Sequence, residues 1–221
     1  MRIRKLKHLI KQAIKIKKMY SQNNEQQIIL NHFGEFKGHL LDLGANDGET
    51  FSNSLKAIQK GWSADLIEAS PETFKRLQTL HNGNDNVKCH NVAVSNIDGK
   101  IKFYESGTLL GGNDKSLVST CNPNELKRWP DVQFTEISVD SLTFAGLLNQ
   151  TKSTKFDLIT IDIEGVDWLV LNQMNLTTLG CKMIIVETNG VETLKYVNYC
   201  KKFGFQTLST NAENLIMIKN G

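Results

Sequence analysis

The chain lacks a run of about 18 apolar residues, the length at which a membrane-spanning helix becomes possible, and its N-terminus lacks the apolar core of a secretory signal. Cysteines are also few. The four present form no Cys-x-x-Cys pair and have no histidine near them at zinc spacing, which argues against a structural zinc site. These absences predict reduced thiols and a cytoplasmic location; the cysteines are Cys89, Cys121, Cys181 and Cys200.

Three further patterns are missing. Without a Gly-x-Gly-x-x-Gly turn, a dinucleotide cofactor is disfavoured. Without a Gly-x-Ser-x-Gly elbow, a serine hydrolase has no support. The histidines form no i, i+4 pair and have no flanking acid at ligand spacing. We therefore expect each of them to be structural or exposed: His8, His32, His39, His81 and His90.

What the chain does contain is ordinary for one folded domain: 221 residues, of which 40% are apolar and 22% charged. We expect residues 37–221 to form that domain and residues 1–36 to be an N-terminal helix with a connecting segment. The charge is uneven, because residues 1–20 hold eight bases and no acid, whereas the remainder holds 18 bases and 23 acids.

The apolar residues of segment 1–20 recur at helical spacing, which predicts a basic amphipathic helix. The simplest role for it is to pack its apolar stripe on the body of the protein. A peripheral contact with an anionic membrane, at the inner membrane surface, is a second possibility. Nucleic acid is a weaker candidate, since no interleaved basic and aromatic pattern continues past residue 20.

From residue 40 onward, short apolar stretches alternate with helical patterns, which indicates an α/β fold with a mostly parallel sheet. We expect one reversed edge strand near the C-terminus, where two strands are joined by a short link. We also expect a helix over residues 50–60, and a hairpin at Asp98-Gly99 joining the strand at 87–95 to the one at 100–104. The glycine-rich stretch 105–124 is expected to be a functional loop.

The most informative segment is Leu40–Thr50, which reads as a buried strand, a glycine turn and a helix start. Gly44 and Gly48 allow a close approach of a ligand to the backbone. Acids follow at other strand ends: Glu68, 26 residues after Asp42, and then Asp162 and Glu164. Because ligands of open α/β sheets bind at the carboxyl ends of the strands, these segments predict one binding site.

Four blocks of sequence resemble the FkbM family of S-adenosylmethionine-dependent methyltransferases: Asp42–Thr50, Ile67–Phe74, Asn91–Ser95 and Ile161–Asp167. The resemblance implies a Rossmann-like class I methyltransferase fold, with a mostly parallel seven-stranded sheet, one reversed strand near the C-terminus, and helices on both faces. It also implies S-adenosylmethionine as the cofactor and a hydroxyl of a sugar, glycan or small metabolite as the acceptor.

The resemblance also implies roles for single residues. The methionine part of the cofactor would lie beside four residues of the glycine turn. The ribose would bind to Glu68 beside Ala69, and the adenine would lie near Asn91 and Ala93. Family members commonly carry a lysine two places before the aspartate of the Asp-x-Glu-Gly block, but here that residue is Thr160. The four residues of the turn are Asp42, Gly44, Asn46 and Gly48.

Methyl transfer to an alcohol requires removal of the hydroxyl proton or polarisation of the oxygen by a metal. Asp162 and Glu164 are two apart, which on an extended strand would place both on one face. We hypothesise that they form a base or, with Glu187 at the end of the next strand, a site for Mg²⁺ or Ca²⁺. The alternative is that Asp162 only orders the cofactor and Glu164 caps a turn.

Two other functions remain open. One is an RNA-directed methyltransferase that uses the basic N-terminal helix, although the acidic balance of residues 21–221 argues against it. The other is a non-catalytic, cofactor-binding interaction module. Such a module has no physical need for several carboxylates around one pocket, so the enzyme is the preferred interpretation.

Overall fold

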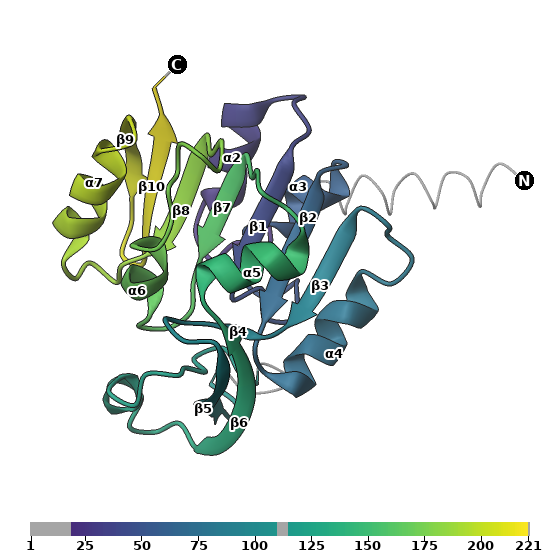
Figure 1. The fold of residues 1–221 in the computed structure, drawn as a ribbon, viewed down its shortest axis with the longest axis vertical. Helices are drawn as coiled ribbons and strands as arrows, with labels where there is room; N and C mark the ends of the chain where they lie inside the picture. The colour runs from purple at the N-terminus through teal and green to yellow at the C-terminus, as the bar shows by residue number, and fades with distance from the viewer. Residues whose placement is uncertain (1–18, 110–114, 221) are drawn as a thin grey trace, which may run out of the picture.

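The computed structural model describes residues 19–109 and 115–220. Its centre is a seven-stranded sheet in the order β3-β2-β1-β7-β8-β10-β9, and a small three-stranded sheet lies below it (Figure 1). The strands of the large sheet are β1 (His39–Leu43), β2 (Ser63–Glu68), β3 (Val87–Asn91), β7 (Leu158–Ile161), β8 (Met183–Glu187), β9 (Phe205–Thr210) and β10 (Asn214–Lys219).

The parallel strands are connected by helices, whereas the last two strands form an antiparallel hairpin. β1 pairs in parallel with β2 and β7, and β7 pairs in parallel with β8, while β10 is antiparallel to both β8 and β9. The mostly parallel sheet with one reversed strand is therefore confirmed. The reversed strand is not at the edge, however, because the hairpin places β10 against β8 and leaves β9 outermost.

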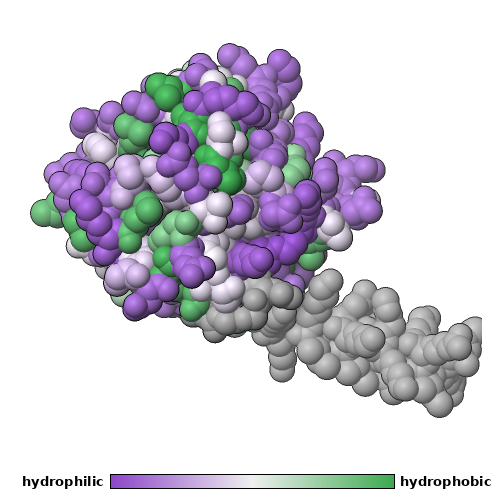
Figure 2. All heavy atoms as spheres, turned by 90° about the horizontal axis from the view of Figure 1, so that it is seen from below, coloured by the Kyte–Doolittle hydropathy of each residue, from purple (hydrophilic) through white to green (hydrophobic). Residues whose placement is uncertain are grey.

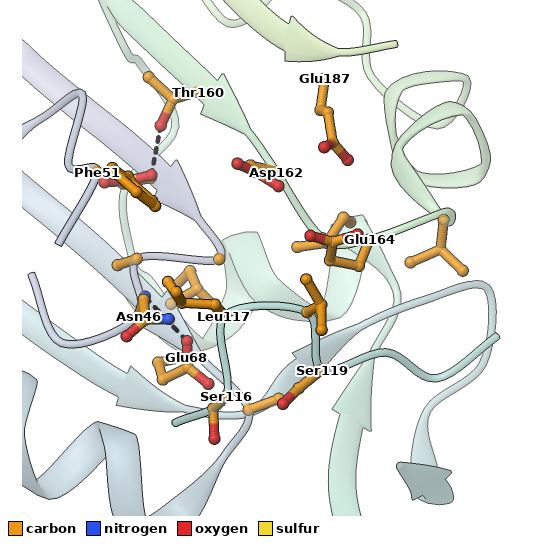
Figure 3. Close-up of a pocket in the computed structure, with 18 of the residues that line it drawn as sticks. Asn46, Phe51, Glu68, Ser116, Leu117, Ser119, Thr160, Asp162, Glu164 and Glu187 are labelled. Carbon is orange, nitrogen blue, oxygen red and sulfur yellow. Dashed lines mark hydrogen bonds between the residues drawn. The ribbon is translucent and has the colours of Figure 1, made fainter. Parts of the chain in front are cut away.

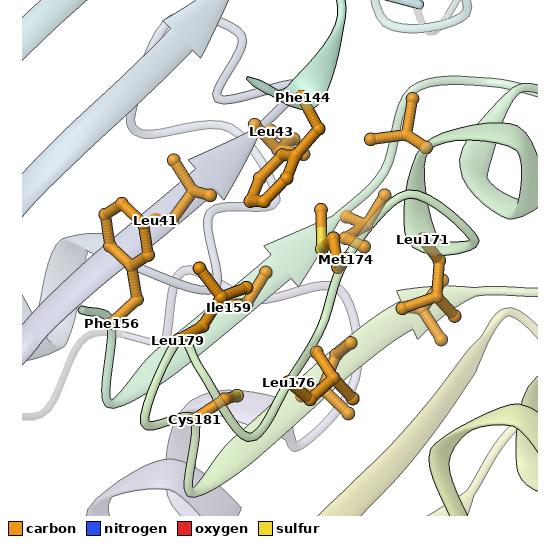
Figure 4. Close-up of a cluster of buried hydrophobic side chains, with 14 of the residues drawn as sticks. Leu41, Leu43, Phe144, Phe156, Ile159, Leu171, Met174, Leu176, Leu179 and Cys181 are labelled. Carbon is orange, nitrogen blue, oxygen red and sulfur yellow. The ribbon is translucent and has the colours of Figure 1, made fainter. Parts of the chain in front are cut away.

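Successive side chains of the central strands enter two different cores, because a strand alternates its faces. Leu41 and Leu43 enter a core beneath α5 (Phe144–Thr151), α6 (Asp167–Leu171) and α7 (Thr193–Lys201), part of which Figure 4 shows. Leu40 enters the opposite core, beneath α2 (Glu25–Phe33), α3 (Leu55–Gln59) and α4 (Pro71–Leu80). Strands buried on both faces explain the nearly continuous apolar runs of the sequence.

The small sheet was not expected from the sequence. It consists of β4 (Ala93–Val94), β6 (Phe134–Leu142) and β5 (Gly99–Ser106), in that order. The expected hairpin at Asp98-Gly99 is therefore wrong, since β6 lies between the two strands that the turn joins. The strand expected at 87–95 is also divided, between β3 in the large sheet and β4 in the small one. Alternating polarity indicates extended segments, but it does not identify the partner of either one.

The expected helix over residues 50–60 is shorter than predicted, because α3 begins only at Leu55. The side chain of Asp47 accepts the N–H groups of Glu49 and Thr50, and Phe51 has a left-handed φ of 54°. This local turn delays the helix. By contrast, α4 begins at a local sequence signal for a helix start: Pro71 is its first residue and the Ser70 side chain accepts the Thr73 N–H.

The predicted basic helix of residues 1–20 falls largely on residues 1–18, which lie outside the described residues. Within the described ranges, no helix is long and apolar enough to cross a membrane. Seen from below, the molecule shows mostly hydrophilic side chains, with hydrophobic ones in small groups between them (Figure 2). This face thus offers no single broad apolar patch among its described side chains.

Candidate active site

A cavity of about 270 Å³ lies where the parallel strands of the large sheet end. Its lining comes from the turn after β1, the end of β2, the loop after β7, and residues 116–121, which follow the small sheet's β5. Figure 3 shows that Glu68 and Asn46 lie on one side, and Asp162, Glu164 and Glu187 on another. The cavity is therefore placed where ligands of this fold class bind.

The glycine turn after β1 fits against the loop that carries Asp162. Gly44 has a φ of 87°, and a Cβ on it would lie 1.8 Å from the backbone oxygen of Asp162. Only glycine is compatible with that approach. Asn46 is also left-handed, and its backbone N–H donates to a Glu68 oxygen at 2.9 Å. Gly48 packs against α4 instead and is not among the residues that line the cavity.

Asp42 is buried beside Thr160, its partner in the β1–β7 pairing. The Thr160 hydroxyl donates to the Asp42 carboxylate, which also lines the cavity. Burial raises the pKa of Asp42, although hydrogen bonds from Ser54 and Thr160 oppose the shift. Thr160, which stands where family members often carry a lysine, therefore supplies a neutral hydrogen bond to Asp42.

Glu68 ends β2 and is buried at the cavity wall. Its two oxygens accept the backbone N–H groups of Asn46 at 2.9 Å and Ser70 at 2.7 Å. Burial raises the pKa of Glu68 to about 7, with the nearby Glu105 adding to the shift and the two backbone donors opposing it. This carboxylate is therefore fixed inside the site and is not a solvated surface acid.

The predicted adenine side is only partly assembled at the cavity. Ala69 and Ala93 line it, together with the apolar side chains of Val92 and Phe103. Asn91 does not line it. Its side-chain amide donates to the backbone oxygens of Glu68 and Ala69, at 2.8 Å and 3.1 Å, and so supports the turn that follows β2.

Three carboxylates converge at the other end of the cavity. Asp162, Glu164 and Glu187, here called the acid trio, each place one oxygen within 4.8 Å of the other two. The expectation of an extended strand through Asp162 and Glu164 is wrong, because β7 ends at Ile161 and Glu164 has a φ of 50°. A reversal of the loop, rather than the alternation of a strand, brings the two acids together.

Two side chains that the sequence did not single out hold this loop. The Asp167 carboxylate accepts the N–H groups of Ile163 at 2.9 Å and Gly165 at 3.0 Å. The Thr120 hydroxyl donates to the backbone oxygen of Glu164 at 2.6 Å. Asp167 sits at the first position of a helix, a common place for an acid, and that pattern could have identified it. No local signal points to Thr120, which comes from a distant segment.

The acid trio is strongly perturbed electrostatically. Burial raises the pKa of Glu187 to about 9, and Asp162 and Asp167 add to the shift. Burial and the charge of Glu187 raise the pKa of Glu164 well above its usual range. Asp162 is exposed to the cavity, yet the surrounding protein and the charge of Glu164 also raise its pKa well above the usual range. Such shifts are typical of functional sites.

A base and an indole stand near the trio, in or next to the 3-10 helix η1 (Glu125–Arg128). Arg128 donates to Glu125 at 2.6 Å, and the same nitrogen lies 3.9 Å from a Glu164 oxygen. The Trp129 ring lies beneath the Arg128 guanidinium, 5.6 Å away. Both residues line the cavity.

The histidines within the described ranges are not among the residues that line the cavity. His39 and His90 both contact Asp65, through their Nε2 atoms at 2.8 Å and 2.9 Å. His81 is buried beside Gly48. None of these three side chains lines the cavity, and the free cysteines are half-buried or buried, with Cys121 alone at the cavity wall.

Comparison with solved structures gives weak overall likenesses. A precorrin-6y methyltransferase from Geobacter metallireducens GS-15 is 11% identical, with 92% of each chain covered and a TM-score of 0.49. A 16S rRNA methyltransferase of T. thermophilus, solved in complex with AdoMet and guanosine, is 15% identical, with 89% of this chain and 42% of that chain covered and a TM-score of 0.43. No curated protein matches the chain.

The family comparison is more direct. Residues 42–207 match the model of the methyltransferase FkbM domain, and this range begins at Asp42 and contains all three members of the acid trio. The match extends over most of the chain and confirms the resemblance that the four sequence blocks indicated. The chain belongs to the FkbM family of S-adenosylmethionine-dependent methyltransferases.

Proposed function

We propose that the protein transfers a methyl group from S-adenosylmethionine to a hydroxyl of a sugar, glycan or other small metabolite. One observation carries the proposal: a single cavity has a fixed carboxylate, Glu68, at one end and the acid trio at the other. The first suits a ribose, and the second suits a group that must lose a proton. The acceptor class itself follows from the family resemblance.

The residues of the cavity fit the donor in chemical character. Glu68 retains lone pairs for the two ribose hydroxyls after accepting its two backbone N–H groups. The left-handed turn at Gly44 and Asn46 leaves room for the methionine part beside Asp42. The apolar wall at Ala69 and Ala93 suits the adenine. No pyrophosphate has to be held, which agrees with the absence of a Gly-x-Gly-x-x-Gly turn.

The bound donor supplies an electrophilic methyl group on a sulfonium. The chain then has to hold an acceptor oxygen in line with that methyl, exclude water, and deal with the hydroxyl proton. A carboxylate of Asp162 or Glu164 with a raised pKa is a competent proton acceptor. Alternatively, these acids act through a hard cation that polarises the acceptor oxygen.

Two measurements test the proposal. Calorimetry should show saturable binding of S-adenosylmethionine by the full chain, weakened at least tenfold in Glu68→Gln. Transfer of a labelled methyl group into fractionated extract of the source organism should then label a hydroxyl-bearing compound. Absence of S-adenosylmethionine binding contradicts the proposal, and so does a label found only on nucleic acid or protein.

A further inference from the structure

We propose that the acid trio binds one hard divalent cation, Mg²⁺ or Ca²⁺, with Asp162, Glu164 and Glu187 each giving one oxygen. The role of this cation in catalysis rests on the proposed function, because it would polarise the acceptor oxygen. The binding of the cation does not depend on the proposed function, and it can be measured without any acceptor.

The spacing of the three carboxylates fits a single ion. One oxygen of each lies within 4.8 Å of the other two. Two oxygens that bind the same Ca²⁺ at about 2.4 Å can be at most about 4.8 Å apart, and three evenly spaced ones about 4.2 Å, so the longest spacing would need to close slightly. For Mg²⁺, with oxygens at about 2.1 Å, these limits are about 4.2 Å and 3.6 Å, so the side chains would need to close further.

Buried oxygens without donors distinguish this trio from an ordinary group of surface acids. Oε2 of Glu164 and Oε2 of Glu187 are both buried and have no hydrogen-bond partner. The two residues are only 8% and 9% exposed. In Figure 3 their carboxylates and that of Asp162 point toward a common space. An ionised oxygen that is buried without a donor is costly, and a bound cation would remove that cost.

The donor set indicates which class of metal would bind. All three ligands are carboxylate oxygens, with no imidazole or thiolate, which favours hard cations over zinc or copper. Within residues 19–109 and 115–220, this is the one group of three or more Asp, Glu, His or Cys side chains that is close enough to share an ion. Three carboxylate ligands leave coordination positions of the ion for water or for an acceptor oxygen, so the ion would remain accessible from the cavity.

Arg128 already places a positive charge close to the trio without occupying it. Its Nη1 lies 3.9 Å from Oε2 of Glu164, too far for a hydrogen bond, and is held by Glu125 at 2.6 Å. A divalent ion in the trio would be repelled by this guanidinium. Removing the Arg128 charge should therefore strengthen cation binding, which a damaged or misfolded site would not do.

The test is calorimetry on the full chain after dialysis against a chelator, titrated separately with MgCl₂ and CaCl₂. We expect saturable binding of one ion per chain. Affinity should fall at least tenfold in Glu187→Gln and rise at least threefold in Arg128→Gln. Glu213→Gln is the matched control: Glu213 lines the same cavity but accepts from Asn23 outside the trio, so its removal should change affinity less than twofold.

The proposal is overturned if neither ion binds saturably at millimolar concentration, or if Glu187→Gln and Glu213→Gln weaken binding equally. If Glu187→Gln does not fold by circular dichroism, Arg128→Gln decides, and an unchanged or weaker affinity rejects the site. Cation binding that depends on Glu187 without any methyl transfer would support the site and reject the proposed function. Full methyl transfer in excess chelator would reject the cation and leave that function intact.

Discussion

Asp65 and the acid trio both contain buried carboxylates of the same sheet, Asp65 in one case and Glu164 and Glu187 in the other, and they differ in their hydrogen-bond donors. Asp65 lies on β2 with no exposed surface, and its oxygens contact Nε2 of His39 and His90 and accept from the Ser153 hydroxyl at 2.7 Å. In the trio, by contrast, Glu164 and Glu187 each keep a buried oxygen without a donor.

These hydrogen-bond donors lower the pKa of Asp65, whereas the pKa values of the trio are raised. Burial alone would raise the pKa of Asp65, but hydrogen bonds from the two histidines and Ser153 outweigh it and hold the pKa well below its usual range. In the trio, burial and the neighbouring acids outweigh the charge of Arg128 and the hydrogen bond of Asn189 to Glu187, so the pKa values there rise. We infer that the Asp65 group stabilises the fold, whereas the trio is kept unsatisfied for something that binds.

The largest expected effect is on catalysis. Asp162→Asn should lower the turnover of labelled-methyl transfer by about 100-fold or more, the range associated with loss of a catalytic base or its equivalent. The dissociation constant for S-adenosylmethionine should change less than threefold, because Glu68 and the glycine turn remain. Asp140→Asn, at an exposed pair with Lys100, is the control. A large loss of S-adenosylmethionine affinity with turnover preserved would make Asp162 a binding residue instead.

The next effect is on stability, at Asp65. Asp65→Asn replaces one acceptor oxygen with an N–H₂ group that faces a histidine donor, so it should lower the free energy of unfolding by about 3 kcal/mol. Urea unfolding monitored by circular dichroism measures this. Asp140→Asn should cost less than about 1 kcal/mol, as expected for an exposed ion pair. Equal losses in the two variants would remove the distinction between a structural acid and a surface one.

The sequence predicted most of the large sheet because its signals are local. The apolar stretch at 40–43, the Ser70-Pro71 helix start and the apolar stretch of β8 each identify an element from neighbouring residues. The pairing of β5 with β6 could not be predicted in this way. It depends on contacts between residues 28 to 42 positions apart, such as Gly99 with Ser141 and Ser106 with Phe134, which no local pattern records.

The same limit applies to the functional groups. Asp42, Glu68 and the trio were found because strand ends of parallel sheets converge, which is a rule of topology. His39, Asp65 and His90 are 26 and 25 residues apart on three neighbouring strands, and only the register of β1, β2 and β3 brings them onto one face. The left-handed conformation of Glu164 was also beyond reach, since it depends on tertiary hydrogen bonds to its loop.

The pH dependence of stability should separate the two kinds of buried acid. An unfolded glutamate titrates at about 4.3, whereas Glu68 in the fold titrates at about 7. Between these values the folded state holds a proton that the unfolded state releases, so stability falls as pH rises, by on the order of 3 kcal/mol. Asp65 acts in the opposite sense: its contribution is present above about pH 3.9 and is lost as pH falls further.

Urea unfolding at pH 3, 5 and 7.5 in the presence of a chelator checks this prediction. Glu68→Gln should reduce the fall in the free energy of unfolding between pH 5 and 7.5. Asp65→Asn should reduce the fall in the free energy of unfolding between pH 5 and 3. If the free energy of unfolding of Glu68→Gln still fell by the full amount between pH 5 and 7.5, the raised pKa of Glu68 would be contradicted.

The smallest expected effect is a gain in stability. Glu164→Gln keeps the shape of the side chain but removes a charge that is buried beside Glu187, so the metal-free protein should become more stable by about 1 kcal/mol. For a chain of this size that corresponds to a rise in melting temperature of roughly 2–4 °C. Glu136→Gln, which removes an exposed partner of Lys102, is the control and should show no gain. A loss of stability in Glu164→Gln would mean that its carboxylate is already satisfied in the fold, and the contrast with Asp65 would then disappear.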